Sequence, residues 1–123
     1  MSKSKINRVK RVVEKWKPIL GLDHWEFTFS YTKSYTGEAA NIVTTPSYLR
    51  SHITIFEELF KPYNPLEKII VHELCHVLTE PAYSISVDFY NGKHTSLKDI
   101  EHFREVATEQ IARAVLRAKG VKW

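Results

Sequence analysis

Hydrophobic residues recur at helical spacing near the start of the chain. The apolar positions are Ile6, Val9, Val13 and Trp16. Basic residues fill most of the positions between them, and Pro18 ends the pattern. Side chains three or four residues apart lie on one face of an α-helix. The pattern therefore predicts an amphipathic first helix over about residues 4–17.

The spacing of apolar residues changes to two further along the chain. Polar residues alternate with Trp25, Phe27, Phe29 and Tyr31. This alternation predicts a half-buried strand. Residues 34–38 include Gly37 and predict a hairpin turn, and further strands are expected at about 39–45 and at 51–56. We expect these strands to form a three-stranded, mainly antiparallel sheet.

A second helix is predicted after the sheet. Residues 64–67 read Asn-Pro-Leu-Glu, which places Asn at the N-cap, Pro at the first helical position and Glu at the third. We expect this helix to run to about Thr79 and to end before Pro81. Residues 80–95 are rich in Tyr, Ser, Asn and Gly, which predicts a loop.

The last predicted helix covers about residues 96–119, with Gly120 at its C-terminal cap. The order is therefore helix, three strands, helix, loop and helix. This order indicates an α+β fold. The length of 123 residues predicts one domain, residues 1–123.

Composition narrows the class of protein. Apolar residues make up 43% and charged residues 26% of the chain, with 4 Gly and 5 Pro, which excludes a disordered or low-complexity protein. The apolar runs are too short for a bilayer span, so we expect no contact with a membrane. The single cysteine, Cys75, excludes an internal disulfide and fits a reducing cytoplasm. We expect a cytoplasmic monomer.

Positive charge is concentrated in the first 17 residues, which hold seven Lys or Arg against Glu14 alone. The simpler interpretation is the solvated face of an amphipathic helix. The alternative is a weak contact with nucleic acid through this basic helix.

The second predicted helix carries the motif His-Glu-x-x-His, as His72-Glu73-Leu74-Cys75-His76. His72 and His76 are one helical turn apart, so both imidazoles can bind one Zn²⁺. Glu73 lies about 100° further round the helix, where it can act on a water molecule without being a ligand. The apolar residues of this helix lie opposite the histidines. Cys75 is expected to be a small packing residue.

A catalytic zinc needs a third protein ligand. Thr79 and Ala82 stand where the extended metzincin motif requires Gly and His, which excludes that class. The candidates are Glu101, Glu105, Glu109, His94 and His102. A helical wheel places Glu105 inside the apolar sector of the last helix, where a carboxylate needs a positive partner. We therefore expect Glu105 to be the ligand, and Glu109 to orient a ligating histidine or to replace Glu105.

These features resemble the zincins of the gluzincin type, in which a second helix supplies a Glu ligand. More narrowly, residues 22–25, residues 69–76 and the Glu-containing last helix are similar to small zincin-like metallopeptidases of tailed bacteriophages and prophages. A weaker likeness to the peptidases that inactivate phage repressors rests on Glu105 and Glu109. The resemblance implies a minimal zincin-like domain, a metalloprotease that acts in a bacterial host's cytoplasm.

The sequence thus predicts a hydrolase with one Zn²⁺ per chain that cleaves a peptide or protein substrate, with Glu73 as general base. Donors to the developing oxyanion are expected among Tyr83, Tyr90, His94 and His102. The strand at 51–56, if it lies at the sheet edge, would bind an extended peptide by strand addition. Two alternatives stay open, a DNA-associated protein and a catalytically silent zincin fold with a structural or lysis-associated phage role.

Overall fold

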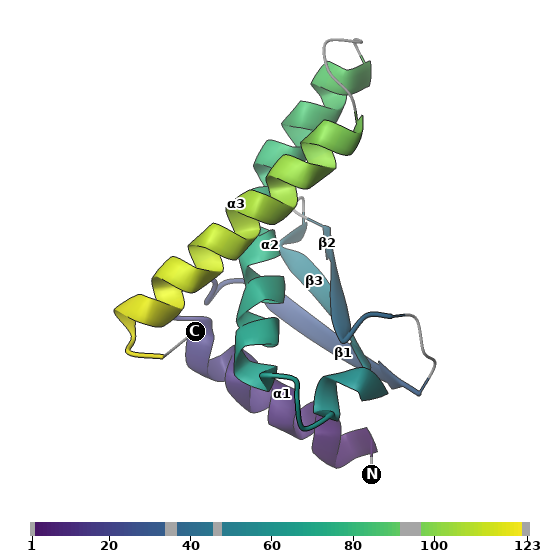
Figure 1. Cartoon of the computed structure of the whole chain (residues 1–123), viewed down its shortest axis with the longest axis vertical. Coiled ribbons are helices and arrows are strands. Elements are labelled where there is room, and N and C mark those ends of the chain that lie inside the picture. The colour runs from purple at the N-terminus through teal and green to yellow at the C-terminus, as the bar shows by residue number, and fades with distance from the viewer. Residues whose placement is uncertain (1, 34–36, 46–47, 92–96, 122–123) are drawn as a thin grey trace. The chain divides into compact units, whose positions relative to one another are not determined.

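The described part of the chain has an α+β architecture of three helices and a three-stranded mixed sheet (Figure 1). The structure is a computed structural model, and it describes residues 2–33, 37–45, 48–91 and 97–121. Contacts divide the chain into two units, Met1–Leu74 and Cys75–Trp123. The boundary falls inside one helix, α2 (Leu66–Asn91). The expectation of one domain over residues 1–123 stays a prediction.

The first helix, α1 (Ser2–Trp16), forms where the apolar pattern predicts it. After α1 the chain turns at Gly21, which has a φ of 71°. The amide of Leu22 donates to the carbonyl of Lys17 at 2.8 Å, and the amide of Gly21 donates to that of Pro18 at 3.3 Å. This bond pair is a Schellman cap, which favours Gly in the left-handed position and directs Leu22 into the core.

The sheet has β3 (Arg50–Phe56) in the middle (Figure 1). β1 (Glu26–Thr32) runs parallel to β3, and β2 (Ala40–Thr45) runs antiparallel to it. The expectation of a mainly antiparallel sheet is therefore wrong, because one of the two strand pairs is parallel. A short 3₁₀ helix, η2 (Glu57–Phe60), follows β3.

The central position of β3 overturns one further expectation about the sheet and leaves the condition of another unmet. The turn at residues 34–38, of which 34–36 lie outside the described residues, does not close a hairpin, because β1 and β2 lie at opposite edges of the sheet. The strand at 51–56 is not an edge strand. Its backbone pairs with a strand on each side, so no extended peptide can add to it.

The inner face of the sheet, α1 and the start of α2 form the core of the first unit. Its apolar residues that are at most 7% exposed are Val9, Val13, Trp16, Leu22, Ala40, Ile53, Ile55, Phe56, Leu59, Ile70, Val71 and Leu74. The other sheet face is polar. There the ring of His52 lies within hydrogen-bond distance of the hydroxyls of Thr28 at 2.7 Å and Ser30 at 2.9 Å.

The first turn of α2 is attached to the end of α1 through Glu67. The Glu67 carboxylate accepts from Lys15 Nζ at 2.7 Å and from Trp16 Nε1 at 2.8 Å. The bond from Lys15, followed by the bond from Trp16, lowers the pKa of Glu67. Asn64, the expected N-cap, donates through Nδ2 to the Glu58 carbonyl at 2.6 Å.

α2 continues well past its predicted end at Thr79 and runs through Pro81 to Asn91. The prediction of a loop over 80–95 is therefore wrong for residues 80–91, and residues 92–96 lie outside the described part. Proline removes one backbone donor from a helix, which contacts with a neighbouring helix can offset. Here the second half of α2 packs against α3 (Leu97–Ala118), and the two run antiparallel (Figure 1).

α3 ends as the sequence predicts. Gly120 has a φ of 80°. The amide of Gly120 donates to the carbonyl of Arg117 at 3.0 Å, and the amide of Val121 donates to that of Leu116 at 2.9 Å. This is again a Schellman cap. Among the described residues, no helix combines the length and the apolar character that a membrane crossing requires.

Candidate metal centre

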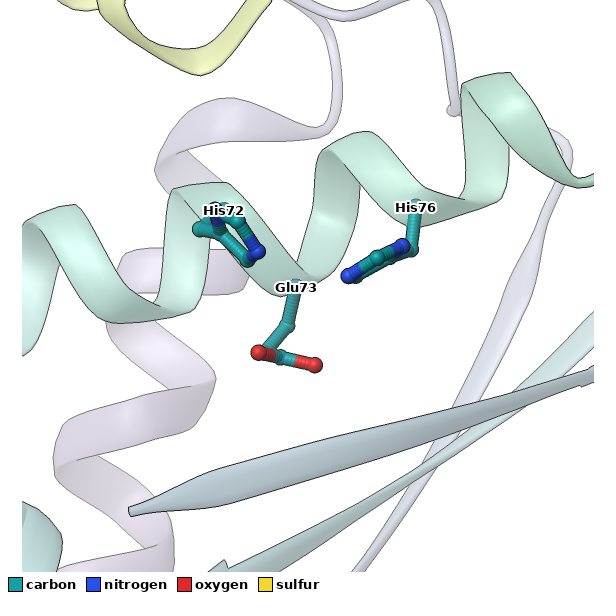
Figure 2. A group of neighbouring side chains, drawn as sticks. All are labelled: His72, Glu73 and His76. Carbon is teal, nitrogen blue, oxygen red and sulfur yellow. The ribbon is translucent and has the colours of Figure 1, made fainter. Parts of the chain in front are cut away.

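The side chains of His72, Glu73 and His76 leave α2 on the same side (Figure 2). One possible ligand atom from each of His72, Glu73 and His76 lies within 4.8 Å of the other two. All three side chains are half-buried. The arrangement follows from the helical repeat, because residues four apart stand one turn above each other.

The opposite side of α2 holds the helix in place. Ile70, Val71, Leu74 and Val77 are at most 2% exposed. Two leucines of the predicted apolar arc depart from this burial, since Leu78 is 41% exposed and Leu66 is half-buried. Burial of these apolar residues fixes the rotation of the helix about its axis, and with it the half-buried side on which the histidines lie.

His76 meets Glu105 from the neighbouring helix. The Oε1 atom of Glu105 lies 3.3 Å from Nε2 of His76, and the His76 side chain is 12% exposed. Glu105, the residue that the sequence favours as third ligand, therefore lies beside His76 in this structure. Its setting differs from the prediction, because half of the Glu105 side chain is exposed to solvent.

Glu105 shares the face of α3 that is buried further along the helix. Arg104, Thr108, Ala112 and Leu116 follow at intervals of four residues, and the last three are fully buried. Ala107 and Ala114, which the helical wheel counts as core, are exposed. On the wheel Glu105 stands between Ala112 and Leu116, so its exposure follows from its position along α3, where most of residues 101–107 are exposed, and not from a different buried face.

Arg104 is the basic residue that does not fit the apolar sector of the wheel, and it has acidic and aromatic partners. Its guanidinium carbon lies 3.9 Å from the centroid of the Tyr83 ring. Its Nη1 lies 3.9 Å from a Glu80 oxygen, and its Nε lies 3.5 Å from Oε2 of Glu105. Arg104 thus approaches one oxygen of Glu105 while His76 approaches the other.

Two buried threonines, Thr79 and Thr108, contact His76 on the side away from Glu105. Neither is among the site residues that the sequence predicts. Thr108 Oγ1 lies 3.3 Å from His76 Nδ1 and 2.9 Å from Thr79 Oγ1. Thr79 also donates to the His76 carbonyl at 3.2 Å. The sequence does contain a sign of this role. Thr108 shares one face of the last helix with Ala112 and Leu116, and a hydroxyl that is buried among apolar residues needs a hydrogen-bond partner.

Glu109 accepts a hydrogen bond from Arg113 Nε at 2.8 Å. It also lies near Cys75, which is fully buried. Burial, and then the charge of Glu109, raises the pKa of the Cys75 thiol to about 12. The thiol is therefore neutral, which suits a packing residue. The expected role of Glu109 beside a ligating histidine stays a prediction.

The other sequence candidates are dispersed. Tyr83 lies against Arg104, as described above. Glu101 and His102 are exposed, and the His102 ring centroid lies 6.0 Å from that of Phe103. Tyr90 belongs to α2, but its side chain lies outside the described part, and His94 lies outside the described residues altogether.

Comparisons with protein-family models, with curated proteins and with solved structures gave no match for the chain.

Proposed function

We propose that the protein is a zinc-dependent peptidase of the gluzincin type, in which His72, His76 and Glu105 hold the metal. The observation that carries the proposal is the approach of Glu105 Oε1 to His76 Nε2, added to the His-Glu-x-x-His motif. We also propose kinship with the small zincin-like peptidases of tailed phages, on the residues that resemble them.

The distance between these two atoms fits a shared zinc ion. Ligand atoms about 2.05 Å from a tetrahedral zinc stand about 3.3 Å apart, because the tetrahedral edge is about 1.6 times the bond length. The observed separation of Nε2 and Oε1 is 3.3 Å. An imidazole lone pair and a carboxylate oxygen repel each other at this distance unless a proton or a cation lies between them.

Two imidazoles and one carboxylate are a typical donor set for catalytic zinc. Bound zinc supplies polarisation of the scissile carbonyl and lowers the pKa of a water molecule. Glu73 projects beside the two histidines on α2. Its carboxylate takes the proton of the attacking water and then passes it to the leaving amine.

The environment of Glu105 supports a ligand that offers one oxygen. Arg104 attracts Oε2 of Glu105, which leaves Oε1 directed at His76. The donor to the developing oxyanion is proposed among Tyr83, Tyr90, His94 and His102. Of these, Tyr83 packs its ring against Arg104, the neighbour of Glu105.

Zinc content and hydrolysis measured together test the proposal. We expect about one Zn²⁺ per chain by elemental analysis, and cleavage of casein that a chelator abolishes. Glu73→Gln is expected to keep the zinc and lose hydrolysis, because only the proton-transfer group is removed. A wild-type protein that takes up no zinc would overturn the proposal. Zinc without hydrolysis of casein, cell-wall peptides or host lysate would assign the protein to the catalytically silent alternative.

A second candidate function is binding of nucleic-acid phosphates by the basic face of α1. Two of the seven cations in residues 1–17 are neutralised within the fold, Lys5 by Glu57 at 2.6 Å and Lys15 by Glu67 at 2.7 Å. Among the described residues, no carboxylate forms a salt bridge with the remaining five, which are Lys3, Arg8, Lys10, Arg11 and Lys17.

The packing of α1 favours a phosphate backbone over a membrane. Val9, Val13 and Trp16 are at most 1% exposed, so the helix has no apolar face left for insertion between lipids. Because these residues belong to the core, deleting the helix is a poor test.

Charge variants of the intact chain provide a better test. We expect duplex DNA binding that weakens steeply with salt, and a shallower salt slope after combined Lys3→Gln, Lys10→Gln and Arg11→Gln substitution. The exposed Lys33, Lys61 and Lys119, changed to Gln together, are the control with equal net charge. Equal slopes in both variants, or binding to anionic phospholipid vesicles alone, would contradict this function.

A further inference from the structure

We infer that Thr108 is the positioning residue of His76. Its hydroxyl oxygen accepts a hydrogen bond from Nδ1–H of the His76 ring, and this bond leaves Nε2 free of a proton and directed at a metal. This inference rests on the proposed function, because positioning His76 matters only if the residue binds a metal. It concerns residues within the C-terminal unit, and it assigns to a hydroxyl the role that the sequence suggested for Glu109.

Thr108 lies where its hydroxyl can fix the imidazole ring. Its side chain is fully buried, and its Oγ1 is 3.3 Å from Nδ1 of His76. On the opposite side of the same ring, Nε2 faces Glu105 at 3.3 Å. The two ring nitrogens therefore have separate partners, both supplied by α3.

We assign the direction of each bond from the acceptor that can take the Thr108 hydrogen. The Thr108 hydroxyl has one hydrogen, and the Arg104 carbonyl, which can only accept, lies 2.8 Å away. With that hydrogen bonded to the carbonyl, Thr108 Oγ1 keeps a lone pair for His76 Nδ1–H. The Thr79 hydroxyl, whose hydrogen also reaches the His76 carbonyl, lies 2.9 Å from Thr108 Oγ1 and does not need a hydrogen from it. A neutral imidazole protonated at Nδ1 has its lone pair on Nε2, as metal binding requires.

Such a hydrogen bond sets both the tautomer and the ring orientation of a ligand. In metal sites this role commonly falls to a carboxylate or a backbone carbonyl. Here a buried hydroxyl performs it, because its own hydrogen is bound one turn back along α3. Thr108→Val removes the oxygen but keeps the shape of the side chain, whereas Thr108→Ser keeps the oxygen.

The first measurement is zinc affinity, by competition with a chelator. We expect Thr108→Val to weaken zinc binding about 10- to 100-fold, and Thr108→Ser to stay close to wild type. Thr79→Val is the control, since it removes a buried hydroxyl that touches the His76 carbonyl and the Thr108 hydroxyl but not the ring. We expect it to change the affinity less than about threefold, because the ring keeps its partner. Equal losses in Thr79→Val and Thr108→Val would assign the effect to packing and overturn the inference.

The second measurement is the nitrogen-15 spectrum of the His76 ring in the zinc-loaded protein. We expect a proton on Nδ1 that exchanges slowly with solvent in wild type and in Thr108→Ser, and rapidly in Thr108→Val. An Nδ1–H signal that Thr108→Val leaves unchanged would overturn the inference while the proposed function stands. Failure of the wild-type protein to bind zinc would instead remove the proposed function itself, and with it the purpose of the contact.

Discussion

Nε2 of His76 and Oε1 of Glu105 lie 3.3 Å apart, on helices that the sequence separates by a predicted loop. Both atoms are acceptors when the imidazole is neutral and protonated at Nδ1. The pair is therefore complete only with a proton or a cation between its members, and the first prediction follows from this.

Glu105→Ala is expected to cost the protein its zinc and its hydrolytic activity, because one of three protein ligands is lost. Glu109→Ala is expected to weaken zinc binding by about 10- to 100-fold at most, since the sequence alone suggests a role for Glu109 behind a ligand rather than on the metal. Glu101→Ala, an exposed site on the same helix, is the control and should retain both properties. Elemental analysis and casein hydrolysis check these outcomes. Loss of zinc in Glu109→Ala with retention in Glu105→Ala would transfer the ligand role to Glu109.

Arg104→Leu is expected to destabilise the protein by about 1–3 kcal/mol, because Glu80 and Glu105 lose a shared cation in a partly buried setting. The contact between the guanidinium and the Tyr83 ring is lost as well. Arg104→Lys keeps the charge but not the planar group, and should recover only part of the loss. Urea unfolding at neutral pH measures the difference. Equal stability of Arg104→Leu and wild type would show that the cluster adds nothing to the fold.

Glu67→Gln is expected to lower the free energy of unfolding by about 1 kcal/mol at pH 7, after allowance for partial solvent exposure. The pKa of Glu67 is lowered in the folded protein, so its contribution is present above the ordinary value of 4.5 and is lost as the pH falls below it. The gap between Glu67→Gln and wild type should therefore close in acid. Glu14→Gln, an exposed change on α1, should leave stability unchanged at every pH. A gap that stays constant into acid would exclude the bonds from Lys15 and Trp16 as its cause.

Cys75 is expected to resist thiol reagents in the native protein at pH 8, because its pKa of about 12 leaves almost no thiolate. Since the pKa is raised, the contribution of Cys75 to stability is complete below its ordinary value of 9.0 and is lost as the pH rises towards 12. Labelling with and without urea tests this directly. Cys75→Ala should keep its zinc, and rapid native labelling or zinc loss would point to a ligand role instead.

Local chemistry made much of the fold predictable. The apolar spacing of α1, the alternation in β1 and Gly120 at the end of α3 all correspond to observed elements. The strand order was not predictable in this way. Ile53 pairs with Phe29 on one side and with Ile42 on the other, and both pairings depend on contacts between distant segments rather than on the residues at the turns.

The candidate site shows the same division between local and distant causes. The geometry of His72 and His76 follows from the helical repeat alone. Glu105 was selected by an argument about burial, and the structure places it beside His76 although half of its side chain is exposed. The role of Thr108 could not be predicted from the sequence, because a single threonine in a helix is common. Its importance depends on the packing of α3 against α2, which brings His76 within reach.

The length of α2 has a consequence for the cost of binding a metal. A helix that ended at Thr79 would carry His76 in its last turn, where the backbone frays and a ligand must be ordered each time an ion arrives. Because α2 runs on to Asn91, its fraying end is twelve residues further along the chain. The backbone that carries both histidines is thus ordered in advance. The entropy cost of ordering the two histidines is therefore met when the protein folds. Less free energy has to be spent on ordering them when the ion binds, so the affinity for the ion is higher.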